Sequence, residues 1–209
     1  MPFITVRVVV CDPGVGNVRS VVRAIERASG AREVVVTRDP AAVRSAAHVV
    51  VPGQGAFGPF VRAIAGGLGD ALREHVAAER PYLGICLGMQ VLFSSSEEAP
   101  GEPGLGLLEG HVRRLAAGVD PVTERSHALP HIGWNAVEGT LTDGRAPYFY
   151  FAHSYAAAPD DPSIVSGTTT YGDARFTSAI ASGSMRGVQF HPEKSQREGL
   201  ALLASFFRL

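Results

Sequence analysis

The chain has 209 residues, of which 45% are hydrophobic and 19% are charged. This composition excludes a disordered chain, and the length is enough to bury a core without disulfides. The formal net charge of -1 excludes the basic field that attracts nucleic acid or an anionic membrane. We expect a single domain over residues 1–209 that binds neither.

The chain's two cysteines, Cys11 and Cys86, are fewer than a secreted disulfide scaffold uses. Residues 1–10 lack the basic start, the long apolar core and the cleavage site of a signal peptide. No run approaches the ~20 apolar residues of a spanning helix. These features favour a reducing cytoplasm.

In the first half of the chain, short apolar runs alternate with stretches whose apolar residues recur every three or four positions. The short runs predict buried strands, and the spaced stretches predict helices. Pro52-Gly53 is expected to end the third strand, and Asp39-Pro40 to open a short helix. The expected strands are 6–11, 34–36, 48–51 and 82–85, and the expected helices are 17–28, one from 39, 59–79 and 89–93.

The pattern changes after about residue 110. Between 110 and 189, short apolar runs are separated by Gly, Pro, Asp and Ser, which predicts strands and loops, some of them antiparallel. Residues 197–207 again have helical spacing. Strands alternating with helices indicate an α/β fold, with an open, mostly parallel but mixed sheet flanked by helices.

Cys86 lies in the strongest local motif, Gly84-Ile85-Cys86-Leu87-Gly88, at a predicted strand-to-helix junction. This pattern is typical of a nucleophile elbow, in which a sharp turn requires flanking residues without side chains. The expected helix after it would favour the thiolate at its N-terminus. The alternative is a buried structural cysteine in a glycine-rich turn.

A thiol nucleophile needs a base, and the base needs an acceptor that orients it. His191 and Glu193 supply this pair in Gln189-Phe190-His191-Pro192-Glu193. Two residues apart in an extended segment, their side chains would point the same way. The alternative is a loop histidine beside a surface glutamate.

A glycine-rich segment, Pro52-Gly53-Gln54-Gly55, follows the third predicted strand. Amide cleavage passes through an oxyanion that needs backbone N–H donors, and Gly53, Gly55 and Leu87 are positioned in sequence to supply them. A phosphate-binding loop is the competing hypothesis, but the Walker lysine and the GxGxxG spacing are missing.

These three motifs, in this order, resemble the class I glutamine amidotransferases. The resemblance implies an open, mostly parallel seven-stranded sheet, with no metal and no cofactor. It makes Cys86 the nucleophile, His191 the base and then the acid, and Glu193 the residue that orients His191. The groups that it implies for glutamine and its oxyanion are Gly53, Gly55, Leu87, Gln90 and the backbone of Ser154 and Tyr155.

Further segments, from about residue 5 to residue 207, resemble the glutaminase subunits of imidazole glycerol phosphate synthase in histidine biosynthesis. The resemblance implies a (β/α)₈-barrel cyclase partner, which uses the ammonia to make imidazole glycerol phosphate and an aminoimidazole carboxamide ribotide. The segments that carry it are 12–17, 104–110, 130–135, 150–155 and 191–195.

The same resemblance places Asn17, Trp134, Tyr150 and Lys194 on the surface that faces the cyclase. Read without it, they are a helix start, a core tryptophan, a strand tyrosine and a solvated lysine. The sequence departs from the family at Gln54, where a small apolar residue is common, and at Pro13, where an aromatic residue is common.

Other functions remain open on the sequence alone. One is the glutaminase subunit of another amidotransferase, and another is a stand-alone γ-glutamyl cysteine hydrolase or a peptidase. A third is a binding module that kept the fold, but such a module has no need of a complete Cys-His-Glu set. Because ammonia made without an acceptor is lost, we expect a glutaminase subunit that stays idle without its partner.

Overall fold

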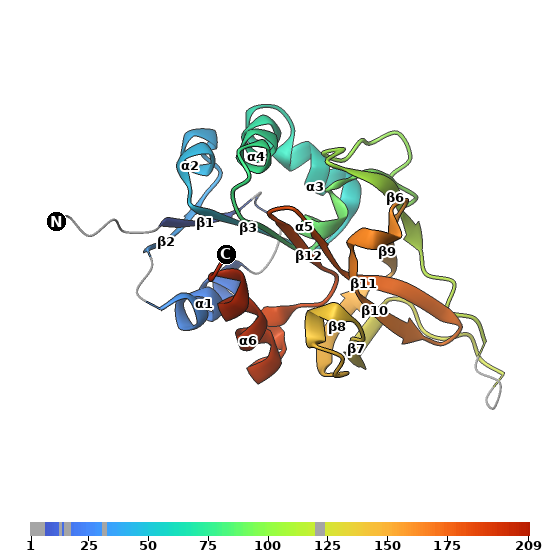
Figure 1. Cartoon of the computed structure of the whole chain (residues 1–209). Coiled ribbons are helices and arrows are strands. Elements are labelled where there is room, and N and C mark those ends of the chain that lie inside the picture. Colours follow the sequence, from blue (N-terminus) through green and yellow to red (C-terminus); the bar gives the residue numbers. More distant parts are fainter. Residues whose placement is uncertain (1–6, 13, 15–17, 31–32, 120–123) are drawn as a thin grey trace.

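The computed structural model describes residues 7–12, 14, 18–30, 33–119 and 124–209. Within them, seven strands form a central sheet in the order β10-β11-β12-β4-β3-β1-β2 (Figure 1). The strands β12, β4, β3, β1 and β2 run parallel, whereas β11 runs antiparallel to both of its neighbours. Their bounds are β1 Arg7–Cys11, β2 Glu33–Thr37, β3 His48–Gly53, β4 Tyr82–Cys86, β10 Val165–Tyr171, β11 Ala174–Ser182 and β12 Met185–Val188. The predicted open, mostly parallel sheet is confirmed.

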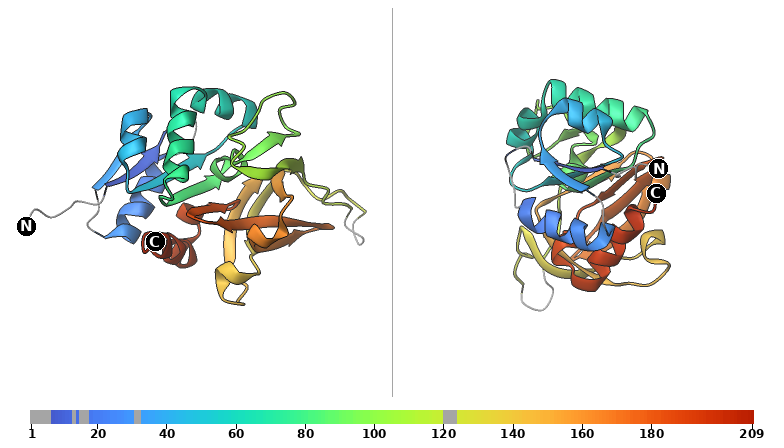
Figure 2. Two further views of the ribbon diagram at one scale, coloured as in Figure 1. Left: turned by 45° about the horizontal axis from the view of Figure 1, so that its top comes forward. Right: turned by 90° about the vertical axis from the view of Figure 1, so that its left-hand side faces the viewer.

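Helices cover both faces of this sheet (Figures 1 and 2). Consecutive side chains of β1 point to opposite faces, so Val9 joins one apolar cluster while Val8 and Val10 join the other. Burial on both faces explains why this strand is a continuous apolar run. The helices of the Val9 face are α2 Pro40–Ser45, α3 Phe57–Ile64 and α4 Gly67–Ala77, and those of the opposite face are α1 Val18–Ser29 and α6 Gln196–Phe206.

Two smaller sheets extend one end of the molecule, and all of their strands except β5 lie in the region from about residue 110 to 189 where strands were expected. One pairs β5 Phe93–Ser96, β6 Leu108–Arg114 and β9 Tyr155–Pro159, and the other is the antiparallel hairpin of β7 His131–Ala136 and β8 Tyr148–His153. Short 3₁₀ helices are η1 Thr140–Thr142, η2 Pro162–Ile164 and η3 Pro192–Lys194.

Three predicted boundaries are wrong. β3 continues through Pro52 to Gly53, because these residues pair with the end of β4. The predicted helix 59–79 is two helices, interrupted at Gly66, whose φ of 71° is not helical. The predicted helix 89–93 is instead α5 Leu87–Gln90 followed by β5. The carbonyls of Val91 and Leu92 accept hydrogen bonds from distant residues 105–108, which draws this segment away from a helix.

The order β12-β4-β3 brings three carboxyl ends of parallel strands to one edge of the sheet. Gly53 pairs with Cys86, and Val188 pairs with Ile85. The segment that leads to His191 therefore leaves the sheet directly beside Cys86, although the two residues are far apart in sequence. Open α/β sheets place their ligand sites at this edge.

Gly88 allows α5 to pack directly on β3. A Cβ at Gly88 would lie 1.7 Å from the Val51 carbonyl oxygen, so no side chain fits without moving the strand. Gly84 is equally tight, since a Cβ there would lie 2.3 Å from the Gly88 oxygen. The two glycines predicted to flank the elbow are thus required by backbone contacts.

We predict that Gly88→Ala destabilises the fold by about 3 kcal/mol or more, because backbone atoms must separate. Urea unfolding of the purified variant measures the loss. Gly67→Ala is the matched control, since a Cβ there meets nothing closer than Pro40 Cγ at 3.6 Å, and it should leave stability unchanged. Equal stability of the two variants would contradict the packing argument.

Candidate active site

Cys86 ends β4 and precedes α5 with φ 54° and ψ −109°. A non-glycine residue rarely adopts a positive φ, and it does so where the surrounding structure enforces it. Here the neighbouring strands β3 and β12 hold β4 on both sides, and the glycines let α5 turn back sharply. The turn presents the Cys86 side chain to a cavity.

His191 follows β12, and Glu193 lies in η3. The Nδ1 atom of His191 is 2.9 Å from Oε1 of Glu193, and both side chains are almost fully buried. His191 and Cys86 line the same cavity. Because Nδ1 is engaged by the carboxylate, Nε2 is the ring nitrogen left to serve the sulfur. The expected extended conformation is wrong for Glu193, which reaches the ring from a 3₁₀ turn.

The His191 environment favours the charged imidazolium. Burial alone lowers the pKa of His191, but its interactions as a donor to Cys86 and Glu193, together with the charges of these two groups, outweigh burial and raise the pKa to about 10. A neighbouring imidazolium stabilises a thiolate. Because α5 has only four residues, its dipole contributes little to stabilising the thiolate. His191, and not the helix expected from the sequence, supplies the positive charge.

The backbone of His191 is fixed to strand β8. Its N–H donates to the Tyr150 carbonyl at 2.8 Å. The hydroxyl of Ser195 donates to the His191 carbonyl at 2.6 Å and accepts from the Tyr150 N–H at 3.0 Å. The proposed base and Tyr150 are therefore joined by three hydrogen bonds.

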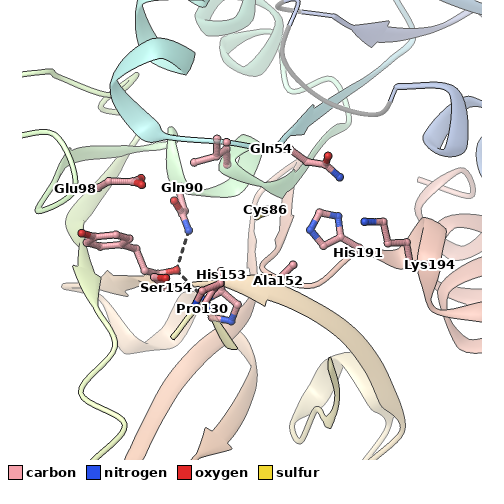
Figure 3. A pocket seen from close by; sticks show the side chains of 13 residues that line it. Gln54, Cys86, Gln90, Glu98, Pro130, Ala152, His153, Ser154, His191 and Lys194 are labelled. Carbon is pink, nitrogen blue, oxygen red and sulfur yellow. Dashed lines mark hydrogen bonds between the residues drawn. The ribbon is translucent and has the colours of Figure 1, made fainter. Parts of the chain in front are cut away.

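Most of the residues predicted to bind glutamine line a cavity of about 370 Å³ (Figure 3). In Figure 3, Gln90 and Glu98 lie to one side of Cys86, and His191 and Lys194 lie to the other. The predicted site residues in its wall are Gly55, Cys86, Leu87, Gln90, Ser154, Tyr155 and His191. Gly53 lies in β3, paired with Cys86.

Gln90 has a defined orientation in this wall. Its Nε2 donates to the Tyr155 carbonyl and to Oε1 of Gln189, each at 2.9 Å. Its Oε1 is buried and has no hydrogen-bond partner among the described residues. The Tyr155 carbonyl also lies 2.9 Å from Nδ1 of His153, so both of its lone pairs are engaged.

Sequence reasoning gave no site role to Glu98 and His153, which line the cavity together with Gln54 of the glycine-rich segment. Glu98 follows β5, and its Oε2 accepts from the Phe57 N–H at 2.9 Å, 41 positions away in the chain. No local motif marks Glu98, because its place depends on the pairing of β5 with β6.

Three of the four predicted partner-facing residues lie together. The rings of Trp134 and Tyr150 are 6.2 Å apart, and Nζ of Lys194 is 5.4 Å from the centre of the Tyr150 ring. Asn17, like Pro13, lies outside the described residues. Exposed Ile132 and Tyr148 flank Trp134 on the hairpin, with 62% and 61% of their surface exposed. We call Ile132, Trp134, Tyr148 and Tyr150 the hairpin patch.

A mixed α/β sheet with a cysteine elbow and a His-Glu pair at the carboxyl edge defines a class I glutamine amidotransferase. The profile of the family "Glutamine amidotransferase class-I" matches residues 9–209. Two relatives carry the name "Imidazole glycerol phosphate synthase subunit HisH". The one from Pyrococcus furiosus is 42% identical over 97% of this chain and 99% of its own. The one from Deinococcus radiodurans is 47% identical over 96% and 93%. The chain belongs to the class I glutamine amidotransferases and, within them, to the HisH family.

Solved structures support the fold. "Crystal structure of glutamine amidotransferase" superposes with a TM-score of 0.74 at 20% identity, covering 97% of this chain and 99% of that one. "Structure of PurLQS from Thermotoga maritima" gives 0.73 at 16% identity, covering 98% of each. Among the described residues, no helix is long and apolar enough to cross a membrane.

We predict that iodoacetamide alkylates Cys86 and spares Cys11 at mildly alkaline pH. Burial, and secondarily the neighbouring Asp12, raises the pKa of Cys11 to about 12, so this thiol stays protonated and shielded. Peptide mapping by mass spectrometry locates the label. Preferential labelling of Cys11 would contradict the assignment of Cys86 as the nucleophile.

We predict that the ion pair of His191 makes stability depend on pH. The pKa of His191 in the folded protein, about 10, exceeds the ordinary 6.5, so its contribution is fully present below pH about 6.5. That contribution is lost as the pH rises through about 10. Glu193→Gln removes one charge that raises this pKa, so the stability advantage of the unaltered protein should shrink with rising pH. Urea unfolding across this range measures it, and a constant difference would contradict the charged pair.

Proposed function

We propose that Cys86, His191 and Glu193 hydrolyse glutamine to glutamate and ammonia for an imidazole glycerol phosphate synthase. In this proposal the ammonia passes to a (β/α)₈-barrel cyclase subunit, which makes imidazole glycerol phosphate and an aminoimidazole carboxamide ribotide in histidine biosynthesis. The observation that carries it is the shared cavity of Cys86 and His191, with His191 held by Glu193 at 2.9 Å. The names of the HisH relatives support the synthase over other glutamine-dependent enzymes.

Acylation begins with the Cys86 thiolate attacking the carboxamide carbon of glutamine. The carbonyl oxygen takes the negative charge, and N–H groups of Leu87 and of the Gly53–Gly55 segment are the proposed donors to it. As the first residue of α5, Leu87 has an N–H without an i−4 helical partner. The C–N bond then breaks, Nε2 of His191 gives its proton to the nitrogen, and ammonia leaves a γ-glutamyl thioester.

Deacylation uses the same groups in reverse. Neutral His191 takes a proton from water through Nε2, and the hydroxide adds to the thioester carbon. The C–S bond breaks with its electron pair on sulfur, which restores the thiolate beside the imidazolium. Glu193 holds Nδ1 throughout, so the ring keeps one orientation for both proton transfers.

The cavity offers groups for both ends of an amino acid. The unpartnered Oε1 of Gln90 and the carboxylate of Glu98 suit an α-ammonium group. The Tyr155 carbonyl already receives two donors, so we assign the N–H groups of Ser154 and Tyr155 to the α-carboxylate. Both cysteines are free thiols, which fits the proposed cytoplasmic location.

We propose the hairpin patch, with Lys194 and Asn17, as the surface that binds the cyclase. The patch exposes large apolar side chains, including 46% of Trp134, as protein interfaces do. Lys194 lies against Tyr150 and also lines the cavity, so the patch adjoins the glutamine site. Tyr150 is linked to His191 by one backbone hydrogen bond and through the Ser195 hydroxyl, so a partner that binds Tyr150 has a short connection to the base.

We predict that the chain alone is a poor glutaminase and that a cyclase with its ligand activates it by a hundredfold or more. The segment around Gly55, whose φ is 96°, can exchange a carbonyl for an N–H at the oxyanion site, and one such donor is worth about 3 kcal/mol. Steady-state assays of glutamate release from the chain, the complex and the liganded complex measure the activation.

Trp134→Ala should weaken this activation, whereas Val119→Ala, at an exposed apolar residue outside the hairpin, should preserve it. Cys86→Ala should abolish hydrolysis in every mixture. Full activity of the chain alone would favour the stand-alone γ-glutamyl hydrolase instead.

A further inference from the structure

Gln189 is a buried amide beside the nucleophile that the Cys-His-Glu triad does not use. It lies between the end of β12 and His191, and none of its surface is exposed. Its Nε2 donates to Sγ of Cys86 at 3.5 Å, a normal distance for a donor to sulfur. Its Oε1 accepts from Nε2 of Gln90 at 2.9 Å.

The neighbours of Gln189 fix which end of its amide faces the sulfur. Nε2 of Gln90 must donate, because it also serves the Tyr155 carbonyl. A flipped Gln189 would oppose two NH₂ groups and turn its oxygen towards the electron-rich sulfur of Cys86. The NH₂ group of Gln90 therefore donates to the Tyr155 carbonyl and to the Gln189 oxygen, and the NH₂ group of Gln189 donates to the Cys86 sulfur.

We propose that Gln189 is a further catalytic residue, which stabilises the Cys86 thiolate through its N–H and links the sulfur to the glutamine site through Gln90. The proposal rests on the glutaminase function above and extends it. A neutral donor binds a thiolate more strongly than a thiol or a thioester, because the bond is charge-assisted. Gln189 therefore favours the thiolate before acylation and again when sulfur leaves the thioester.

Gln90 gives the link to the substrate site. Its Oε1 belongs to a residue of the cavity wall and has no partner among the described residues. A donor on bound glutamine that engages this oxygen polarises the Gln90 amide and strengthens its N–H bond to Gln189. The Gln189 N–H then becomes a better donor to sulfur, so an occupied site favours the reactive form of Cys86.

Gln189→Met removes the donor and keeps the length of the side chain. The ultraviolet absorbance of the thiolate, followed against pH on the resting protein, should become half-developed about one pH unit higher. At a pH below the midpoint of the unaltered protein's curve, alkylation of Cys86 by iodoacetamide should slow about tenfold. Cys11 does not mask the signal over this range, since its pKa is raised to about 12.

Ser178→Ala is the matched control. The Ser178 carbonyl accepts from the Gln189 backbone N–H at 2.9 Å, so this buried side chain shares the neighbourhood without joining the amide chain. It should leave both readouts unchanged. Gln90→Met tests the link. Its shift should be smaller than that of Gln189→Met, and the double variant should match Gln189→Met alone.

Gln189→Glu is a second variant for the case in which Gln189→Met fails to fold. It keeps the shape and the acceptor for Gln90, but it places a carboxylate oxygen at the sulfur, so the thiolate should develop at still higher pH. An unchanged titration curve and alkylation rate in a folded variant would overturn the proposal and leave Gln189 as a buried amide with a structural role only. These readouts need no glutamine turnover, so they stand even if the chain fails to hydrolyse glutamine.

Discussion

The close contact between the turn after β4 and the strand β3 is the constraint on which the site depends. Gly88 packs against the Val51 carbonyl with no room for a Cβ, and Cys86 takes a positive φ so that the chain can turn back over the sheet. The sulfur is thereby carried to the carboxyl edge, where a ligand can reach it. A strained residue held by rigid strands keeps its direction when substrate binds.

The neighbouring strand β12 completes the site from the far end of the chain. Because β12 pairs with β4, both Gln189 and His191 lie near the Cys86 sulfur. Gln189 is a neutral donor to the sulfur, and His191 is held as a charged imidazolium. His191 is in turn hydrogen-bonded to Tyr150 of β8, which belongs to the hairpin patch. A few hydrogen bonds therefore connect the proposed base, His191, to the proposed partner surface at Tyr150.

The sequence predicted the features that local patterns determine. Strand and helix alternation predicted the sheet, and the glycines around Cys86 predicted the sharp turn. Features set by distant pairing were missed. The helix predicted over 89–93 ends at Gln90, because the carbonyls of Val91 and Leu92 accept hydrogen bonds from residues 105–108 and β5 begins at Phe93. Gln189 and Cys86 are 103 positions apart, so their contact depends on the strand order, which periodicity does not reveal.

Trapping the γ-glutamyl thioester is the most direct test of whether this turn presents Cys86 as the nucleophile. The protein, activated by a cyclase and its ligand, is mixed with glutamine, quenched in acid during turnover and analysed by mass spectrometry of its peptides. We expect a γ-glutamyl adduct on the peptide that contains Cys86 and none on the peptide that contains Cys11. Glutamine hydrolysis with no adduct on Cys86, or with the adduct on Cys11, would contradict it.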